Sequence, residues 1–153
     1  MNEHKSAHGR YLETQIKTAT RDQLLLMLYD GAIRFAEQAK EQLFQDQMDT
    51  EKYNSCLVKS QRIVTELTSS LDFNQNEEIA KNLARLYGFI YNQLVQANMK
   101  KEDTYIDNSI RILKSLREAW QDAISKLKAT TSPPSTDSSA NEKKEYTPLS
   151  LHA

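Results

Sequence analysis

The first 132 of the 153 residues contain no proline, and the whole chain has only three prolines and three glycines. Proline disrupts a helix interior and glycine weakens it, so the shortage of both favours a helical body. No apolar run approaches the roughly 20 residues of a membrane span, and the first residues lack the apolar stretch of a signal peptide. A single cysteine, Cys56, excludes an internal disulfide framework and fits a reducing compartment. We therefore expect a cytoplasmic, helical protein without membrane insertion.

Residues that perform chemistry are scarce as well. The three histidines lie near the termini, at His4, His8 and His152, so no expected helix carries an imidazole for metal binding or general-base catalysis. The few glycines are isolated and cannot form a phosphate-binding loop. The net charge is −1, which gives no preference for a polyanion such as nucleic acid. We expect no enzymatic activity, no metal, no cofactor and no nucleic acid partner.

What the chain does contain is four amphipathic segments, at about residues 20–45, 49–72, 76–99 and 103–128. Each has apolar residues three and four positions apart, which is the pattern of one helix face. Thr20 with Gln23 predicts a capping box at the first segment. The second segment is expected to begin near Asp49 or Thr50 and the fourth at Asp103, and Asn74 with Glu77 three positions on predicts a cap for the third. Short joins make consecutive helices antiparallel, so the prediction is an all-α, antiparallel up-down four-helix bundle.

Two segments flank the expected bundle of residues 20–128. Residues 1–19 have a few apolar side chains, which suffice for a strap or a short docked helix but not for a core. Residues 129–153 are rich in Ser, Thr and Pro, a composition that predicts a disordered tail. The end of this tail, Tyr146–Leu151, has three apolar residues, which leaves a short docking motif as an alternative to a simple unstructured terminus.

Two of the helices carry more apolar surface than one bundle stripe requires. The run Leu24–Tyr29 consists of six consecutive apolar residues, which cover the whole circumference of a helix. Within the first helix, Leu26 and Ile33 share a second face with Phe44, and in the third helix Tyr87 and Tyr91 lie beside the main stripe.

Two explanations of this surplus stay open. The N-terminal strap, through Tyr11 and Ile16, or the offsets between the helices can cover it within the monomer. Alternatively it forms a groove for another chain, because exposed apolar patches mark interaction sites and tyrosines supply rigid contact area. A weakly docked strap that a partner displaces reconciles the two explanations.

Blocks of sequence, in consistent order and spacing over about residues 10–124, carry a family resemblance: Tyr11–Ile16 with Thr18–Thr20, Leu24–Phe35, Ile63–Leu67 leading to Ser70–Asp72, Leu86–Tyr87 with Ile90–Tyr91, Leu94 with Ala97–Asn98, and Leu116–Trp120. In these blocks the chain resembles the flagellin-specific export chaperones, the FliS family. The residues after Lys128 are not part of the family's pattern.

The resemblance implies a cytoplasmic chaperone that needs no ATP. Such a chaperone binds the C-terminal segment of unassembled flagellin, prevents premature polymerisation and supports delivery to a component of the flagellar type III export gate. Flagellar regulators or co-chaperones are further expected partners. On this reading the flagellin-binding residues are Leu26, Ile33, Tyr87 and Tyr91, and the movable strap contains Tyr11 and Ile16. The alternative is a helical-bundle dimerisation or adaptor module that has no unfolded client.

Overall fold

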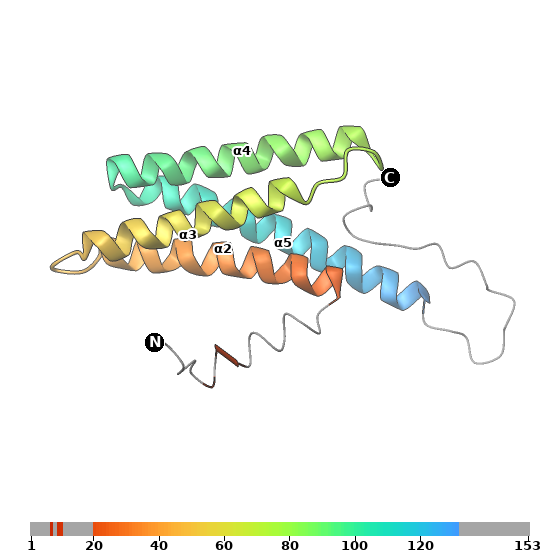
Figure 1. Cartoon of the computed structure of the whole chain (residues 1–153), viewed down its shortest axis with the longest axis horizontal. Helices are drawn as coiled ribbons and strands as arrows, with labels where there is room; N and C mark the ends of the chain where they lie inside the picture. The colour runs from red at the N-terminus through yellow and green to blue at the C-terminus, as the bar shows by residue number, and fades with distance from the viewer. Residues whose placement is uncertain (1–6, 8, 11–19, 132–153) are drawn as a thin grey trace, which may run out of the picture.

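The computed structural model describes residues 7, 9, 10 and 20–131, and over residues 20–131 it consists of four helices (Figure 1). Their bounds are α2 Arg21–Leu43, α3 Thr50–Ser69, α4 Glu77–Lys100 and α5 Asp103–Thr131. Consecutive helices run in opposite directions, and α5 returns to pack against α2 as well as α4. The predicted all-α, up-down four-helix bundle is confirmed.

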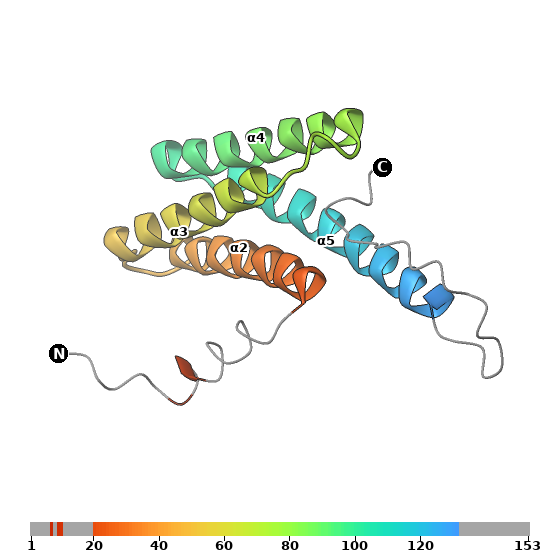
Figure 2. The ribbon, with the colours of Figure 1, turned by 45° about the vertical axis from the view of Figure 1, so that its right-hand side comes forward.

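The structure describes only part of the two segments that flank the expected bundle. The expected strap residues Tyr11 and Ile16 lie outside the described residues, as does the expected tail from residue 132 onward. Residues 129–131 continue α5 as a helix, beyond the expected end at residue 128. With 29 residues, α5 runs past the first turn of α2, and it separates from the first half of α4 in both views (Figures 1 and 2).

The helix starts follow the capping rules, with one correction. Thr20 and Gln23 form the predicted capping box, and Asp49 accepts a hydrogen bond from the Lys52 amide. The cap of α4 is Asn76 rather than Asn74: the Asn76 Oδ1 accepts from the Ile79 amide at 3.1 Å. Asn74 lies in the preceding turn, where its own amide donates to the Asp72 carboxylate at 2.9 Å.

The end of α4 depends on Lys101, the one non-glycine residue with a positive φ (57°) among those the structure describes. Its amide donates to the Ala97 carbonyl at 2.9 Å, and its ammonium donates to the Asn98 carbonyl at 2.8 Å. The same ammonium lies over the Tyr53 ring, 5.2 Å from the centroid. Backbone and side-chain contacts of Lys101 therefore terminate the helix.

Buried polar groups in the core find partners inside the bundle. The Tyr53 hydroxyl donates to the Ala97 carbonyl at 2.7 Å, and the Ser60 hydroxyl donates to the Ala32 carbonyl at 2.9 Å. Each bond joins two helices, because donor and acceptor come from different elements. Burying these hydroxyls without acceptors would cost about 1–3 kcal/mol each, so the bonds fix the relative positions of the helices.

Gly31 and Cys56 both serve packing in the core. A Cβ on Gly31 would lie 3.1 Å from the Ile63 Cδ1, so glycine permits α2 and α3 to approach closely. Cys56 is a buried free thiol on α3, as expected for a small apolar side chain.

Three ion pairs line the outer edge between α2 and α5. Asp30 pairs with Arg117, Glu37 pairs with Lys114 at 3.3 Å, and Lys40 pairs with Asp107 at 2.6 Å. Along α2 the residues are two acids followed by a base, and their partners on α5 follow in the reverse chain order, as expected for antiparallel helices. We call this edge the α2–α5 seam; its solvent side is covered by the three ion pairs.

Candidate interaction surface on helix α4

Helix α4 is buried along one side and has exposed apolar side chains beyond both edges of that side. Its exposed large apolar residues before the last turn are Ile79, Leu86, Phe89 and Tyr91, with exposed fractions of 37–46%. At about 100° per residue, Ile79, Leu86 and Phe89 share one flank, and Tyr91 lies on the other. We call Ile79, Leu86 and Phe89 the α5-side strip.

A hydrogen bond identifies the direction in which this strip faces. The Asn108 side chain of α5 donates to the Gln93 side chain of α4 at 3.1 Å, and Gln93 shares the flank of Leu86 and Phe89. On α5, the residues on the side of Asn108 include Leu116, which is half-buried, and Ala119, which is exposed. The α5-side strip therefore borders a second row of apolar side chains.

The opposite flank of α4 forms a groove with α3, of about 280 Å³. Its walls include Val64, Thr65 and Thr68 from α3 and Gly88, Tyr91 and Asn92 from α4. A Cβ on Gly88 would meet no atom within 4 Å, so the α4 backbone is open to close approach there. Both threonine hydroxyls donate to carbonyls one turn earlier in α3, which leaves their oxygens able to accept hydrogen bonds. We call this the α3–α4 groove.

Beneath the groove, a buried hydroxyl network joins α2, α4 and α5. The Tyr29 and Tyr87 hydroxyls hydrogen-bond each other, and the Trp120 indole N–H donates to the Tyr29 hydroxyl at 3.1 Å. The two tyrosine rings are tilted by 55° with centroids 6.4 Å apart. Burial raises the pKa of Tyr87 to about 12 and also raises the pKa of Tyr29 above its usual value of 10. These tyrosines are neutral core residues at physiological pH.

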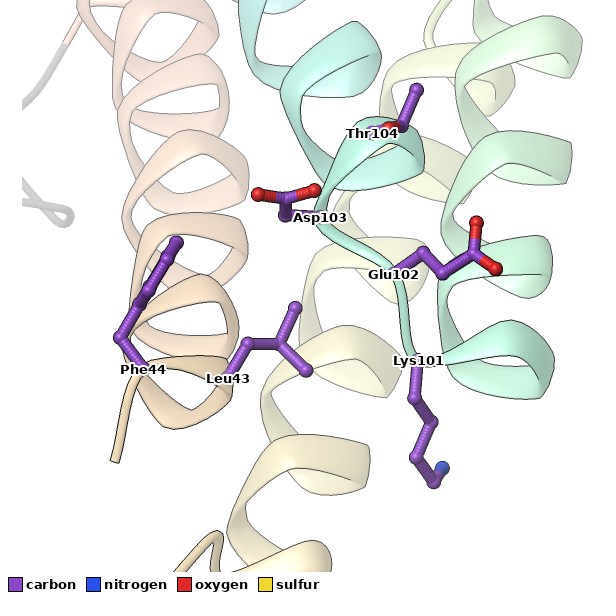
Figure 3. Close-up of a pocket in the computed structure, with 6 residues that line it drawn as sticks. All are labelled: Leu43, Phe44, Lys101, Glu102, Asp103 and Thr104. Carbon is purple, nitrogen blue, oxygen red and sulfur yellow. The ribbon is translucent and has the colours of Figure 1, made fainter. Parts of the chain in front are cut away.

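A second, polar pocket of about 300 Å³ lies at the end of the bundle, between α2 and the α4–α5 turn. Figure 3 shows Leu43 and Phe44 on one side of this pocket and the turn residues 101–104 on the other. Its carboxylates, Glu102 and Asp103, have no histidine or cysteine beside them in the lining. Across the part of the chain that the structure describes, no group of three His, Cys, Asp or Glu side chains is placed to hold a metal ion.

Comparison with known proteins places this helical bundle among flagellar proteins. Residues 4–127 match the family described as flagellar protein FliS. The chain belongs to the FliS family. Three relatives are each named flagellar secretion chaperone FliS. The one from Bacillus subtilis (strain 168) is 34% identical over 120 residues, which are 78% of this chain and 87% of the relative.

The other two relatives are similar at comparable levels. The protein of Vibrio cholerae is 32% identical over 109 residues, covering 71% of this chain and 79% of the relative. That of Salmonella typhimurium is 32% identical over 111 residues, covering 72% and 81%. FliS chaperones are a non-enzymatic kind of protein. Within residues 20–131, no helix is both long enough and apolar enough to cross a membrane.

The residues expected from the FliS resemblance to line the docking surface do not share one exposed face. Ile33 and Tyr87 are buried, with exposed fractions of 7% and 1%, while Leu26 is half-buried and Tyr91 is 39% exposed. Ile33 lies on the side of α2 that α5 covers, and Tyr87 is held inside by its bond to Tyr29. Ile33 and Tyr87 belong to the core, although Tyr87 also lines the α3–α4 groove together with Tyr91. Flagellin binding by these four residues stays a prediction.

The apolar run Leu24–Tyr29 is likewise enclosed more than its pattern indicates. Leu25 and Tyr29 are buried, and the other four residues are half-buried, because α3 and α5 pack on two sides of α2. Phe44, which shared the expected second face, is the C-cap residue of α2 and is 68% exposed.

The sequence pattern missed the α5-side strip in the FliS bundle. Ile79 and Leu86 belong to the stripe that the pattern assigns to the core, and Phe89 was assigned to no stripe. The available signal was Phe89 itself, which lies about 120° around α4 from Leu83 and is 46% exposed. A large aromatic on the polar side of an amphipathic helix indicates a contact outside the bundle.

Proposed function

We propose that this FliS-family protein acts in the cytoplasm as the chaperone of flagellin. It binds the C-terminal segment of unassembled flagellin, prevents premature polymerisation and supports delivery of flagellin to the type III export gate. The family membership supports a role in flagellar secretion. The observation that carries the binding proposal is the exposure of Leu86, Phe89 and Tyr91 on the two flanks of α4.

The spacing of the α5-side strip suits an amphipathic helix from the client. From Ile79 to Phe89 the strip extends over eleven residues of α4 and rises about 15 Å, which is close to three helical turns. A client segment that folds on this surface can place residues of one face against the strip, the arrangement used when a helix docks on an apolar surface. Ordering such a segment costs several kcal/mol, so a broad apolar contact is required.

The α3–α4 groove adds contacts of a different kind. Tyr91 supplies apolar area with a polar tip, and the oxygens of Thr65 and Thr68 supply hydrogen-bond acceptors at the rim. A client chain that crosses α4 near Gly88 can approach the helix backbone closely. The two flanks together therefore provide a surface on which a client wraps around α4.

The α2–α5 seam is unsuited to the same role. Its solvent side carries the pairs Asp30–Arg117, Glu37–Lys114 and Lys40–Asp107, and an apolar client residue would have to desolvate them. This leaves the seam and the polar end of the bundle for the export gate component and for regulators or co-chaperones.

Calorimetric titration with a peptide of the flagellin C-terminal segment tests the proposal. The variant Leu86→Asp with Phe89→Asp should weaken binding by at least tenfold, because it places two charges against the client's apolar face. Its matched control is Phe44→Asp, since Phe44 is more exposed than either residue and lies on the far end of α2. Helicity by circular dichroism should be unchanged in both variants.

Unchanged affinity in the double variant would contradict the proposed surface. A dimerisation or adaptor module predicts another pattern: light scattering would show a tight dimer of this chain that the double variant dissociates and that flagellin does not alter. A monomer that forms a one-to-one complex with flagellin is the result expected for the chaperone.

A further inference from the structure

A short segment with three large apolar residues lies near the end of the chain, outside the part that matches the family. The match ends at residue 127, and α5 ends at Thr131. Residues 132–145 contain four Ser, two Pro and several charged side chains but no large apolar residue. The six residues that follow, Tyr146–Leu151, contain Tyr146, Leu149 and Leu151. A polar linker of 14 residues therefore separates α5 from a short apolar motif.

A line of apolar residues on α5 leads from its end to the α5-side strip. Ile112, Leu116, Ala119, Ala123 and Leu127 follow one another at spacings of three or four residues. Such spacing keeps them on one side of the helix, the side toward α4 that also carries Asn108. Ala119 is exposed and the other four are half-buried, so the line is available along its outer edge.

The second half of α5 separates from the first half of α4 in the ribbon view (Figure 2). On the α4 side, Ile79, Leu86 and Phe89 are 37–46% exposed. The α5-side strip and the α5 line therefore lie on neighbouring flanks of two diverging helices.

We propose that Tyr146–Leu151 docks on the α5-side strip of its own chain and competes there with the client. The docking does not depend on the proposed function, whereas the competition rests on it. The motif matches the surface in chemistry, because its three apolar side chains can pack on an apolar strip.

The linker has a suitable length for this contact. From Thr131 back to Leu116, α5 covers 15 residues, or about 22 Å at 1.5 Å per residue. A random coil of 14 residues would have a root-mean-square span of roughly 20 Å, and its full extension would be about twice that. The effective concentration of a tethered motif is highest when the linker span matches the distance to its site.

The N-terminal segment is less well placed for the same site. It joins the bundle at Thr20, the cap of α2, and α2 packs on the opposite side of α5 through Asp30–Arg117 and Glu37–Lys114. The C-terminal motif starts from α5 itself.

The expected consequence is a modest self-inhibition. With an effective concentration of about 1 mM and a Kd of about 0.3 mM for the free motif, roughly one quarter of the molecules are undocked. The apparent affinity for a client at this strip is then weakened about fourfold. A weak internal ligand of this kind protects the strip while it is empty and gives way to a client that makes a larger contact.

Methyl NMR of the full chain tests the docking without any client. The variant Tyr146→Ser, Leu149→Ser and Leu151→Ser should shift the methyl signals of Ile79, Leu86 and Leu116 relative to the unsubstituted chain. Val64, in the α3–α4 groove, should not move. The matched control, Ser135→Ala with Ser138→Ala and Ser139→Ala in the linker, should leave all four signals in place.

Three results would overturn the proposal. Identical spectra for the triple serine variant and the unsubstituted chain would exclude docking at the strip. Shifts at the strip that appear only with Tyr11→Ser and Ile16→Ser would make the N-terminal segment the occupant. Shifts that depend on protein concentration would make a second copy the occupant.

Titration with the flagellin C-terminal peptide then separates the docking from the proposed function. The triple serine variant should bind the peptide about fourfold more tightly than the unsubstituted chain. If the methyl signals report docking but the peptide affinity is unchanged, the strip is not the flagellin site, and the competition is overturned while the docking stands.

Discussion

Leu86 and Tyr87 are neighbours in the sequence, yet the hydrocarbon side chain is 37% exposed and the tyrosine is 1% exposed. Helix α4 therefore buries the residue with a polar group and leaves a purely apolar residue at the surface. Tyr87 is tolerated inside because its hydroxyl bonds to Tyr29, which in turn accepts from Trp120. Leu86 has no comparable internal contact that would draw it into the core.

The difference shows that a side chain's burial in this bundle depends on its hydrogen-bond partners as well as on its hydrophobicity. A buried hydroxyl with a partner holds three helices in fixed relative positions, and an apolar residue outside the core remains available for another chain. The inward side of α4 thus serves stability, and its outward flanks serve recognition. Stability and binding measurements on the two sides should separate these roles.

The largest expected effect is on stability and comes from removing the inward tyrosine. Tyr87→Ala should lower the free energy of unfolding by about 3–5 kcal/mol, since it leaves a cavity and deprives the Tyr29 hydroxyl of its partner. Leu86→Ala should lower it by at most about 1 kcal/mol. Urea denaturation followed by circular dichroism measures both, and similar losses for the two variants would abolish the distinction between the sides.

Alkaline pH should destabilise the protein through the same inward residues. The folded-state pKa of Tyr87 is about 12, above the value of 10 for an unperturbed tyrosine, so the unfolded chain releases its proton first. The contribution of Tyr87 to the free energy of unfolding is fully present below pH 10. It is lost as the pH rises toward 12, by about 1.4 kcal/mol per pH unit. Denaturation between pH 9 and 12 should show a shallower loss in Tyr87→Phe than in Leu86→Ala.

A smaller effect on stability is expected from alanine substitutions at two glycines, one on the open flank of α4 and one packed against α3. Gly88→Ala on the open flank of α4 should stabilise the fold by about 0.5–1 kcal/mol, because alanine is the better helix former and its Cβ meets nothing within 4 Å. Gly31→Ala should gain less or lose stability, since its Cβ would lie 3.1 Å from the Ile63 Cδ1. Equal melting temperatures for the two variants would count against close packing of α2 on α3.

The smallest effect is expected at the α2–α5 seam. Arg117→Gln removes the partly exposed pair with Asp30 and should cost no more than about 1 kcal/mol, a loss that disappears in 1 M salt. Flagellin peptide affinity should stay unchanged, because the seam lies away from both flanks of α4. Weaker binding in this variant at constant stability would extend the client surface onto α5 and α2.

Local sequence patterns predicted the architecture because the capping residues and the apolar period of each helix can be recognised within its own segment. Thr20 with Gln23 and Asp49 are visible as caps in the sequence, and the structure uses them. The pattern failed where two candidates compete: Asn74 and Asn76 both precede α4, and only the turn, in which the Asn74 amide bonds to Asp72, decides for Asn76.

The docking residues were harder to predict, because exposure depends on how far each helix is rotated about its axis. Ile33 and Tyr91 both lie beside an apolar stripe in the sequence, but α5 covers Ile33 and nothing covers Tyr91 to the same extent. An apolar pattern shows that a residue can be buried. It does not state which neighbouring helix reaches it.

The sequence alone determined the helical class, the number of helices and their antiparallel order, since periodicity, caps and short joins are local properties of the chain. Tertiary structure alone decided that Tyr87 turns inward while Leu86 and Phe89 stay at the surface. The physical reason is that the rotation of α4 is set by contacts between distant segments, above all the bonds that join Tyr29, Tyr87 and Trp120 across three helices.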